Sequence, residues 1–491
     1  MATPAHSYGL PLAPLRALLL ALPLLSLILL LTLHLPPRHR PAPPAPLILP
    51  TPVRTTATAA VAQDGPSSSS SSPSPTTLSH VVFGVASSQR TLPLRLPLLR
   101  LWLRPPARAF LFLDAPPQAA AGSIPANLHL RVSRDASRFP YSYRKGLPSA
   151  VRVARIAKEV LLELRQQQLP PPRWLVLADD DTAFVLPNLL HTLSKYDWQE
   201  PWYLGAPSES GLQNAWHGFS MAFGGGGIAI SWPLAERLAR VLDSCIIRYP
   251  HLYGSDSRIY ACLAELGIEL THEPGFHQID LHRDISGLLR AHPLSPLVSL
   301  HHLDNVYPLY PGMDRAKAVE HFFSAANADP ARIVQQTVCY DHSRSLTASV
   351  AWGYSVQVFK GNVLLPDILA VQKTFVPWKR GRNVTDVFMF TTKPYPTDEC
   401  KRAALFFLKS ISSGKGKTES NYSRQLPQKC LPNLIPLRNM QQIKVRSELL
   451  HLVPGKALRR HCCDIVPSSS EITMDIDIRK CRDDELIAMH S

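Results

Sequence analysis

Short apolar runs alternate with segments of helical periodicity in the first half of the chain. Runs of strand length lie at 80–85, 109–114, 128–132 and 174–178. Between the last two, apolar residues recur every three or four positions over 153–164, and Ser149 stands where a helix cap is expected. Strands and a helix in this order predict an α/β fold built on a parallel, doubly wound sheet.

The same patterns predict more elements downstream. Helices are expected to about Lys195, from Pro233 to about Cys245 and over 259–266, and strands at 202–205, 219–223 and 228–231. Aromatic and β-branched residues then alternate over 349–359 and 384–390. This alternation predicts a smaller, β-rich C-terminal domain. Residues 411–491 show no clear pattern.

The N-terminal segment is strongly apolar. Residues 17–33 carry no charge and are mostly leucine, and with Leu35 they reach the length of a tilted membrane-spanning helix. A cleaved signal peptide is the alternative, but no small-x-small cleavage site precedes the prolines that follow. Arg16 stands before the span and Arg38 and Arg40 after it, so charge does not fix the orientation.

Composition divides the chain further. Residues 36–79 are rich in Pro, Ala, Ser and Thr, a composition that cannot bury a core and predicts disorder. The expected organisation is a cytoplasmic tail at 1–16, a signal-anchor helix at 17–35, a stem at 36–79, an α/β domain at 80–334 and a β-rich extension at 335–491.

Positive charge concentrates in the first third of the chain. The formal net charge is +15, and the segment from Arg38 to Arg173 holds 18 Lys and Arg against 5 Asp and Glu. A basic face suits a nucleotide diphosphate, an anionic glycan or membrane lipid, or is simply a solvated surface. No nucleic-acid motif accompanies the charge, so nucleic acid is not expected as a partner.

Cysteines and sequons indicate the compartment. None of the eight cysteines forms a CxxC pair, which favours some disulfides in an oxidising compartment over a zinc site, with free buried cysteines as the alternative. Two N-glycosylation sequons begin at Asn383 and Asn421. Both features place the bulk of the chain in the secretory lumen.

Three adjacent carboxylates follow the most apolar of the predicted strands, in the sequence RWLVLADDDTAF. Asp179, Asp180 and Asp181 repel one another and need a cation or strong solvation. Oxygen ligands at the end of a buried strand suit Mn²⁺ or Mg²⁺, which also hold a diphosphate. A solvated acidic turn is the alternative interpretation.

Glycines and a further carboxylate follow. The four glycines at 224–227 lack the spacing and the Lys-Ser/Thr of a phosphate loop, so they predict a bend, an ordinary turn or the close approach of a bulky ligand. Asp256 stands at the start of a predicted helix, where it can serve as an N-cap, as a general base, or as both.

Six histidines lie between residues 272 and 302, and their spacing matches no local zinc motif. They are His272, His277, His282, His292, His301 and His302. A histidine in such a segment usually has a structural role. One of them can nevertheless complete a metal site with the acids, since Mn²⁺ accepts imidazole.

Taken in order, these motifs resemble the Fringe-like branch of glycosyltransferase family 31. The matching segments are RWLVLADDDTAF, WYLGAPSE, FGGGGIAIS, YGSDSR and GFHQ, and they extend over about residues 80–304. The likeness is greatest to plant members with a C-terminal extension. It implies a GT-A fold with a DxD motif, a type II Golgi membrane protein, a UDP-sugar donor, Mn²⁺, and inversion with a β-1,3 linkage.

The resemblance also implies roles for individual residues. Asp179 and Asp181 correspond to metal ligands, with Asp179 and Asp180 facing the donor, and Asp256 corresponds to the catalytic base. The glycines expected beside the donor sugar are Gly225, Gly226 and Gly227. The metal histidine corresponds to His277, and because the register there is loose, Asp280 and His282 remain alternatives.

The predicted function is therefore sugar transfer from a UDP-sugar to a hydroxyl of a glycan or glycoprotein. A phosphohydrolase of the DxDxT type would use Asp179 as its nucleophile, but it requires Thr or Val where this chain has Ala183. A non-catalytic, lectin-like protein on the same fold is the other alternative, and the complete set of acids together with Asp256 argues against it.

Overall fold

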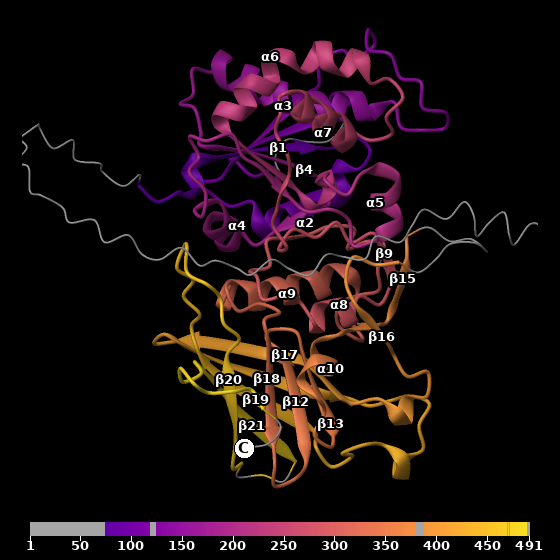
Figure 1. Cartoon of the computed structure of the whole chain (residues 1–491), viewed down its shortest axis with the longest axis vertical. Coiled ribbons are helices and arrows are strands. Elements are labelled where there is room, and N and C mark those ends of the chain that lie inside the picture. The colour runs from indigo at the N-terminus through magenta and orange to yellow at the C-terminus, as the bar shows by residue number, and fades with distance from the viewer. Residues whose placement is uncertain (1–73, 118–123, 379–386, 469, 471, 489–491) are drawn as a thin grey trace, which may run out of the picture. The chain divides into compact units, whose positions relative to one another are not determined.

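The structure is a computed structural model that describes residues 74–117, 124–378, 387–468, 470 and 472–488 (Figure 1). The predicted tail, the predicted membrane span, most of the predicted stem and the sequon at Asn383 lie outside these ranges. Within the described ranges, no helix combines the length and the apolar character needed to cross a membrane.

A seven-stranded sheet forms the first layer of the fold, in the order β3-β2-β1-β4-β7-β6-β8. Its strands are β1 (Val81–Ala86), β2 (Arg108–Leu113), β3 (Leu128–Val132), β4 (Trp174–Asp179), β6 (Tyr203–Gly205), β7 (Ile228–Ser231) and β8 (Thr271–His272). The first four run parallel, as predicted, but β7 is antiparallel to β4 and to β6. The sheet is therefore Rossmann-like and mixed.

The reversal of β7 decides where the glycines lie. Ile228, the first residue of β7, pairs with Leu177 near the carboxyl end of β4. The glycines that precede β7 consequently lie at the carboxyl end of β4, next to the three aspartates that follow this strand. A parallel β7 would have begun at the opposite edge of the sheet.

Helices cover both faces of this sheet (Figure 1). One face packs against α3 (Ser149–Gln166), α6 (Trp232–Arg248) and α7 (Ser255–Glu265). The other packs against α2 (Leu92–Trp102) and α4 (Leu186–Leu193). Helix α9 (Arg315–Ala328) contacts α2 and β17 of the second sheet. The remaining helices are α5 (Gly211–His217), α8 (Ser286–Arg290) and α10 (Leu365–Leu369).

Three details differ from the sequence predictions. The pattern did not predict α2, which contains Pro97 in its interior. Residues 219–223 form no strand, because the chain turns there and Phe223 N–H bonds to the carbonyl of Ala206. The N-cap position of α3 is Pro148, and Ser149 is the first residue of the helix.

A separate eight-stranded sheet follows, in the order β11-β12-β13-β17-β18-β19-β21-β20. Its strands are β11 (Gln336–Asp341), β12 (Leu346–Ala351), β13 (Ser355–Lys360), β17 (Ala404–Gly414), β18 (Lys417–Gln425), β19 (Gln442–Glu448), β20 (Cys462–Val466) and β21 (Thr473–Arg479). The β-rich character predicted for this part of the chain is confirmed.

The predicted boundaries within this sheet are less accurate. The run at 349–359 is a hairpin of β12 and β13 that turns at Gly353, whose φ of 74° favours glycine. The described part of the run at 384–390 contains no strand, only a bridge between Phe388 and Ser210. Four strands begin after residue 411, where no pattern was apparent.

Short strand pairs connect distant segments of the chain. They are β5 (Ala183–Phe184) with β10 (Ser299–Leu300), β9 (Leu281–Arg283) with β15 (Phe375–Pro377), and β14 (Val371–Lys373) with β16 (Thr392–Pro394). The first pair joins the acidic segment to the histidine segment. The second joins the histidine segment to the C-terminal region.

All eight cysteines form disulfides, which confirms the predicted use of cysteine. The pairs are Cys245–Cys262, Cys339–Cys463, Cys400–Cys430 and Cys462–Cys481. The first of these joins α6 to α7, and so it fixes the helix that carries Asp256 against the rest of the α/β layer. The other three lie in the C-terminal region.

Candidate functional site

The acids at the end of β4 lie beside a histidine that reaches them through the β5–β10 pair. Leu300 pairs with Ala183, and the next residue, His301, places Nε2 2.9 Å from Asp181 Oδ1 and 3.8 Å from Asp179 Oδ2. One ligand atom from each of the three residues lies within 4.8 Å of the others. Two carboxylate oxygens and one imidazole nitrogen converge as metal ligands do.

The position and tautomer of His301 are fixed by its surroundings. Its Nδ1 lies 3.1 Å from the carbonyl oxygen of Gln278, which can only accept, so Nδ1 carries a proton. In neutral His301 this leaves a lone pair on Nε2, the nitrogen that faces the acids. A Cβ at Gly225 would lie 2.1 Å from the His301 ring, so only glycine admits the histidine here.

The electrostatics of the cluster favour positive charge. Burial, together with the carboxylates of Asp181 and Asp180, outweighs the opposing charge of His301 and raises the pKa of Asp179 to about 7. Since 41% of the Asp179 side chain stays exposed, this carboxylate stands in a recess that a ligand can still reach. Burial would likewise raise the pKa of Asp181, yet His301 and Arg95 hold it well below its usual range.

The same carboxylates have an effect opposite to that of burial at His301, where they favour the protonated ring. Burial would lower its pKa, but the carboxylates of Asp181 and Asp179 outweigh burial and raise the pKa of His301 to about 9. The three residues therefore attract a cation, whether that cation is a proton on His301 or a divalent metal ion. Together with the oxygen-rich ligand set, this charge distribution fits Mn²⁺ or Mg²⁺.

Asp180 has different partners from its two neighbours. Its Oδ2 accepts hydrogen bonds from Ser87 Oγ at 2.6 Å and Thr91 Oγ1 at 2.8 Å, and Arg95 Nε lies 3.5 Å from its Oδ1. Asp180 thus ties the start of α2 to the end of β4. The contact between Asp180 and the donor, which the resemblance implies, stays a prediction.

Arg95 is the residue of α2 that faces the acids. Its guanidinium lies 3.4 Å from Asp181 and 2.9 Å from Asp304. Sequence reasoning missed Arg95, because α2 was not predicted. It also gave no special place to His301, although an apolar run precedes this histidine much as one precedes the acids.

Asp256 lies across the glycine segment from the acids. Asp256 and Asp179 line one small cavity of about 30 Å³, together with Gly224. The N–H of Gly224 donates to Asp256 Oδ2 at 3.3 Å. The N-cap of α7 is Gly254, and Asp256 is the second residue of the helix, so the N-cap interpretation is wrong.

The other predicted glycines pack against protein atoms. Gly226 N–H donates to Gln278 Oε1 at 2.8 Å, and a Cβ at Gly227 would lie 2.9 Å from Phe184. The close approach that these glycines permit is, in this structure, an approach of protein side chains. Their contact with a donor sugar stays a prediction.

His277 does not join the acids. Its Nδ1 lies 3.0 Å from Glu209 Oε1 and its Nε2 lies 2.9 Å from His292 Nε2. His292 Nδ1 donates to the carbonyl oxygen of Pro293, so His292 Nε2 accepts and His277 Nε2 must donate. Both nitrogens of His277 are thus engaged by Glu209 and His292 rather than directed at the acids, and the geometry favours His301 as the metal histidine.

The two alternatives to His277 lie outside the cluster as well. Asp280 is 2% exposed and accepts a hydrogen bond from Ser208 Oγ at 2.7 Å, and burial raises the pKa of Asp280 to about 7. His282 stacks on Trp378, with ring centroids 4.6 Å apart. Neither side chain belongs to the group of ligand atoms formed by Asp179, Asp181 and His301.

Three of the nine non-glycine residues with positive φ in the described ranges lie in the histidine segment. Ile279, Arg283 and His302 adopt φ values of 54°, 71° and 54°, a region that residues other than glycine rarely occupy. Of these three, Ile279 is the most unusual, because β-branched side chains fit this region poorly. Such strain persists where surrounding contacts over-determine the backbone, as they do at functional sites.

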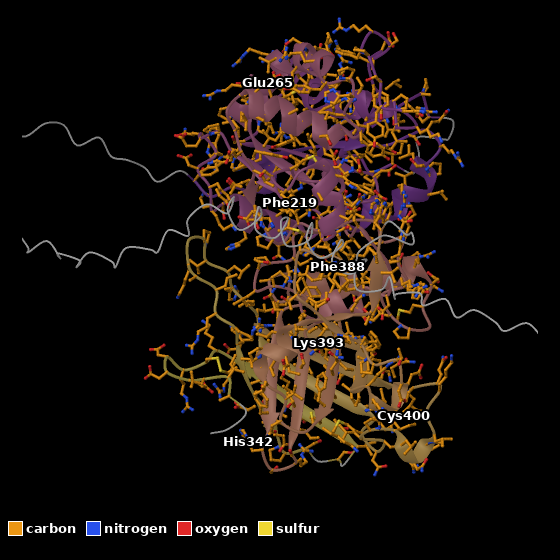
Figure 2. All side chains as sticks on the ribbon, turned by 45° about the vertical axis from the view of Figure 1, so that its right-hand side comes forward. Phe219, Glu265, His342, Phe388, Lys393 and Cys400 are labelled. Carbon is orange, nitrogen blue, oxygen red and sulfur yellow. A yellow bond between two sulfur atoms is a disulfide. The ribbon has the colours of Figure 1, made fainter. Side chains whose placement is uncertain are left out.

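Exposed aromatic side chains gather beside Asp256. We call Tyr143, Trp216, Phe219 and Tyr253 the aromatic patch; each is at least 36% exposed, and Figure 2 labels Phe219. Tyr253 contacts Tyr143 and His217, with ring centroids 5.2 and 5.6 Å apart. Among the described residues, only one other aromatic side chain is as exposed, Tyr307.

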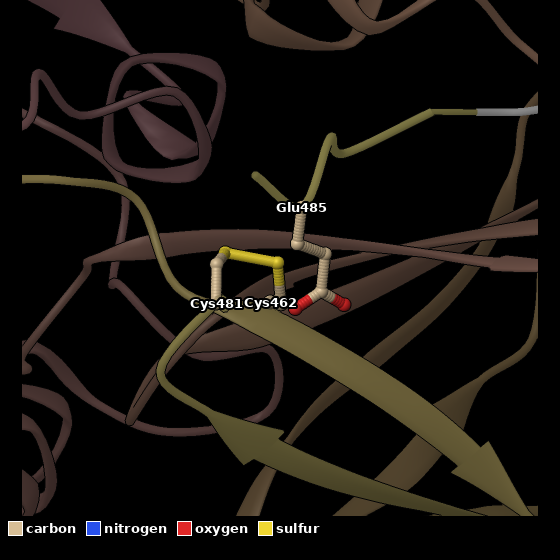
Figure 3. Close-up of side chains that lie close together, drawn as sticks. All are labelled: Cys462, Cys481 and Glu485. Carbon is tan, nitrogen blue, oxygen red and sulfur yellow. A yellow bond between two sulfur atoms is a disulfide. The ribbon is translucent and has the colours of Figure 1, made fainter. Parts of the chain in front are cut away.

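A second group of metal-type side chains is structural. Cys462, Cys481 and Glu485 lie close together, but the two sulfurs are bonded to each other (Figure 3). Glu485 in turn accepts two hydrogen bonds of 2.7 Å from Arg479. These side chains have no free ligand atoms of the kind that a metal requires.

Comparison with known proteins gives the family. A family model described as "Protein of unknown function, DUF604" matches residues 213–463, just over half of the chain. The chain belongs to this family. The match begins within α5 and ends within β20, so it takes in the glycines, Asp256, the histidine segment and most of the second sheet.

Two curated relatives have a named activity. The chain is 38% identical over 105 residues to a mouse beta-1,3-glucosyltransferase and 40% identical over 105 residues to the human one. Each alignment covers 21% of this chain and 20% of the relative. The chain thus spans about a fifth of the length of these relatives.

Proposed function

We propose that this protein is a glycosyltransferase that moves a sugar from a UDP-sugar to a hydroxyl group of a glycan or glycoprotein, with inversion and a β-1,3 linkage. The observation that carries the proposal is the convergence of Asp179, Asp181 and His301 on one point, beside a recess that Asp179 shares with Asp256. Similarity to two beta-1,3-glucosyltransferases supports the same activity. The Fringe-like resemblance and the Rossmann-like sheet support a GT-A fold.

The metal of the proposed enzyme is Mn²⁺, held by Asp179, Asp181 and His301. The ligand types fit, because hard oxygens with one imidazole are acceptable to Mn²⁺. Bound there, Mn²⁺ would act as a Lewis acid that neutralises the charge of a departing diphosphate. The glycines at 225–227 form the wall beside the donor sugar, and Asp180 faces the donor from the end of β4.

Asp256 is the general base of the proposed reaction. Its carboxylate is half-buried, and the Gly224 N–H and its own helix N-terminus orient it toward the recess that Asp179 lines. It would take the proton of the acceptor hydroxyl as the oxygen attacks the anomeric carbon. Attack from the face opposite the UDP inverts this carbon in a single displacement, without a covalent intermediate.

The aromatic patch is suited to the acceptor. One of its members, Tyr253, precedes Asp256 by three residues and contacts Tyr143. Aromatic rings offer a broad apolar face with little loss of conformational entropy. The apolar faces of sugar rings pack well on such surfaces, and this supports a saccharide acceptor.

The proposed setting is the Golgi membrane, with a single span at 17–35 and the catalytic part in the lumen. The proposed domain limits are 80–334 for the transferase domain and 335–491 for the extension. The four disulfides and the sequon at Asn421 support an oxidising lumen.

The test is a screen of UDP-sugars on the purified full-length chain, scored by UDP release with and without Mn²⁺ and with mixed glycan acceptors. Release that requires Mn²⁺ and rises with acceptor supports the proposal. If no donor gives release and UDP does not bind in the presence of Mn²⁺, the proposed transferase activity is wrong and a lectin-like role replaces it.

A further inference from the structure

Four rings form a column that starts at the histidine facing the acids and includes one side chain from the C-terminal region. The ring centroids of His301 and His302 are 3.7 Å apart. Trp378 stacks on His302 at 4.4 Å with planes 10° apart, and His282 stacks on Trp378 at 4.6 Å with planes 9° apart. We call these four residues the ring column.

Trp378 is the member of the column that comes from outside the α/β layer. It directly follows β15, which pairs with β9, and β9 contains His282. The segment after it docks a second time, because Gly211 N–H donates to the carbonyl of Val387 at 2.9 Å and Met389 N–H to that of Glu209 at 3.0 Å. The C-terminal region therefore contacts the α/β layer at two separate segments, 281–283 and 209–211.

The backbone beneath the column is strained and needs such support. His302 adopts a φ of 54°, a left-handed conformation that is unfavourable for a residue with a side chain. Its Nδ1 lies 3.4 Å from the carbonyl oxygen of Ile279, too long for a strong hydrogen bond. Besides His301 and Asp280, whose Oδ1 lies 3.5 Å from its Nδ1, the His302 ring packs face to face against Trp378.

A shift of the His302 ring would reach His301, because the two ring centroids are 3.7 Å apart. The His301 ring is held within the α/β layer by the hydrogen bond from its Nδ1 to the Gln278 carbonyl. The stack of His302 on Trp378 adds a second support from the C-terminal region. Trp378 therefore contributes, through His302, to the orientation of the imidazole whose Nε2 lies 2.9 Å from Asp181.

We propose that Trp378 is a positioning residue for the metal site, so that the C-terminal extension completes a site whose ligands all lie in the α/β layer. This inference rests on the metal assignment of the proposed function. It gives the extension a role, because Trp378 of the extension helps to hold the proposed metal ligand His301 through His302. Partners that orient metal ligands typically change metal affinity by about 10–100-fold when removed.

The test is Mn²⁺ titration by calorimetry on the full-length chain and its variants, with the melting temperature of each. Trp378→Ala is expected to weaken Mn²⁺ binding about 10–100-fold at a melting temperature close to that of the wild type. Trp378→Phe should retain most of the affinity, because a phenyl ring can still stack between two imidazoles. Rescue by a ring distinguishes positioning from general stabilisation.

Phe388→Ala is the matched control, because Phe388 docks the same segment on Ser210 but lies outside the ring column. It should leave Mn²⁺ affinity unchanged. If Trp378→Ala does not fold, His282→Ala takes its place and should weaken binding in the same direction by a smaller factor.

Three results would overturn the inference. One is Trp378→Ala, or His282→Ala in its place, with wild-type Mn²⁺ affinity, and another is an equal loss in Phe388→Ala; both leave the proposed function intact. The third is a wild-type protein that binds no Mn²⁺, which would remove the metal assignment as well. Whether the wild-type protein binds Mn²⁺ therefore distinguishes failure of this inference from failure of the proposed function.

Discussion

The Nε2 atom of His301 lies 2.9 Å from a carboxylate oxygen of Asp181, although more than a hundred residues separate the two in the sequence. The pairing of β5 with β10 creates this contact, because each strand is adjacent in sequence to one of the two residues. The contact turns an acidic turn into a group with three potential metal ligands. Substitutions at this contact give the most direct test of the proposed function.

Asp181→Asn should abolish tight Mn²⁺ binding. The substitution keeps the shape of the side chain but removes one of two charged ligands, and it leaves His301 without its nearest carboxylate. Calorimetric titration with Mn²⁺ measures the effect. Asp304→Asn is the control, because Asp304 shares Arg95 with Asp181 but lies outside the ligand group. Equal Mn²⁺ affinity in the wild type and Asp181→Asn would refute the metal assignment.

Substitutions of His301 and His277 should have opposite effects on Mn²⁺ affinity and on the melting temperature. His301→Gln should weaken Mn²⁺ binding at least about tenfold, because it removes the nitrogen that faces the acids. His277→Gln should leave Mn²⁺ affinity in place and lower the melting temperature, because it breaks buried hydrogen bonds to Glu209 and His292. Both quantities are measured on both variants. The reverse pattern would restore His277 as the metal ligand.

Asp256→Asn should fold and bind Mn²⁺ and UDP normally while transferring sugar at least about a hundredfold more slowly. The amide oxygen of Asn can still accept from Gly224, but an amide cannot take up the proton of the acceptor at neutral pH. The transfer rate, the melting temperature and the UDP affinity of the same variant decide the matter. Near-normal transfer would mean that the base lies elsewhere.

Glycosylation tests the proposed topology. Asn421 lies in the middle of β18 and is half-buried, while Ser420 and Tyr422 on either side of it point inward. A chain made in a secretory host should lose mass on treatment with an N-glycosidase. Asn421→Gln and Asn383→Gln should each remove one glycan. No change in mass for the wild type would contradict a luminal C-terminal region.

The stability of the protein should fall below neutral pH through His461. Burial and the charges of Arg332 and Lys480 lower the pKa of His461 to about 4, whereas an unfolded histidine titrates near about 6.5. Between these values only the unfolded chain takes the proton, so stability is complete above about pH 6.5 and declines toward pH 4.

A His461→Asn variant makes this decline measurable. The Asn oxygen can accept from Arg332 as the histidine nitrogen does, at 3.1 Å in the wild type. The variant should therefore match the wild type at pH 7 and lose less stability at pH 5, by on the order of 1 kcal/mol. Urea unfolding at the two pH values gives the comparison. Parallel losses in both proteins would exclude His461 as the source.

Local sequence pattern was sufficient for the parts of the fold whose signals are short-range. The apolar runs predicted β1, β2, β3 and β4 nearly to the residue; β1, β2 and β4 are buried on both faces and therefore have few polar positions. The acids at the end of β4 and the glycines before β7 were identified on the same basis. The strands after residue 411 were missed because their outward positions are polar and one face of their sheet carries little apolar signal.

The tertiary structure alone decided which of these residues act together. His277 was the expected ligand, but its two nitrogens contact Glu209 and His292, and His301 is the histidine that lies beside the acids. Strand pairs between distant segments brought His301 to the acids and Trp378 to the histidines. Such pairings depend on register and packing across the whole chain, and no local periodicity records them. The sequence therefore determined the chemical groups available to the site, and the long-range pairing of β5 with β10 and β9 with β15 decided which of them meet.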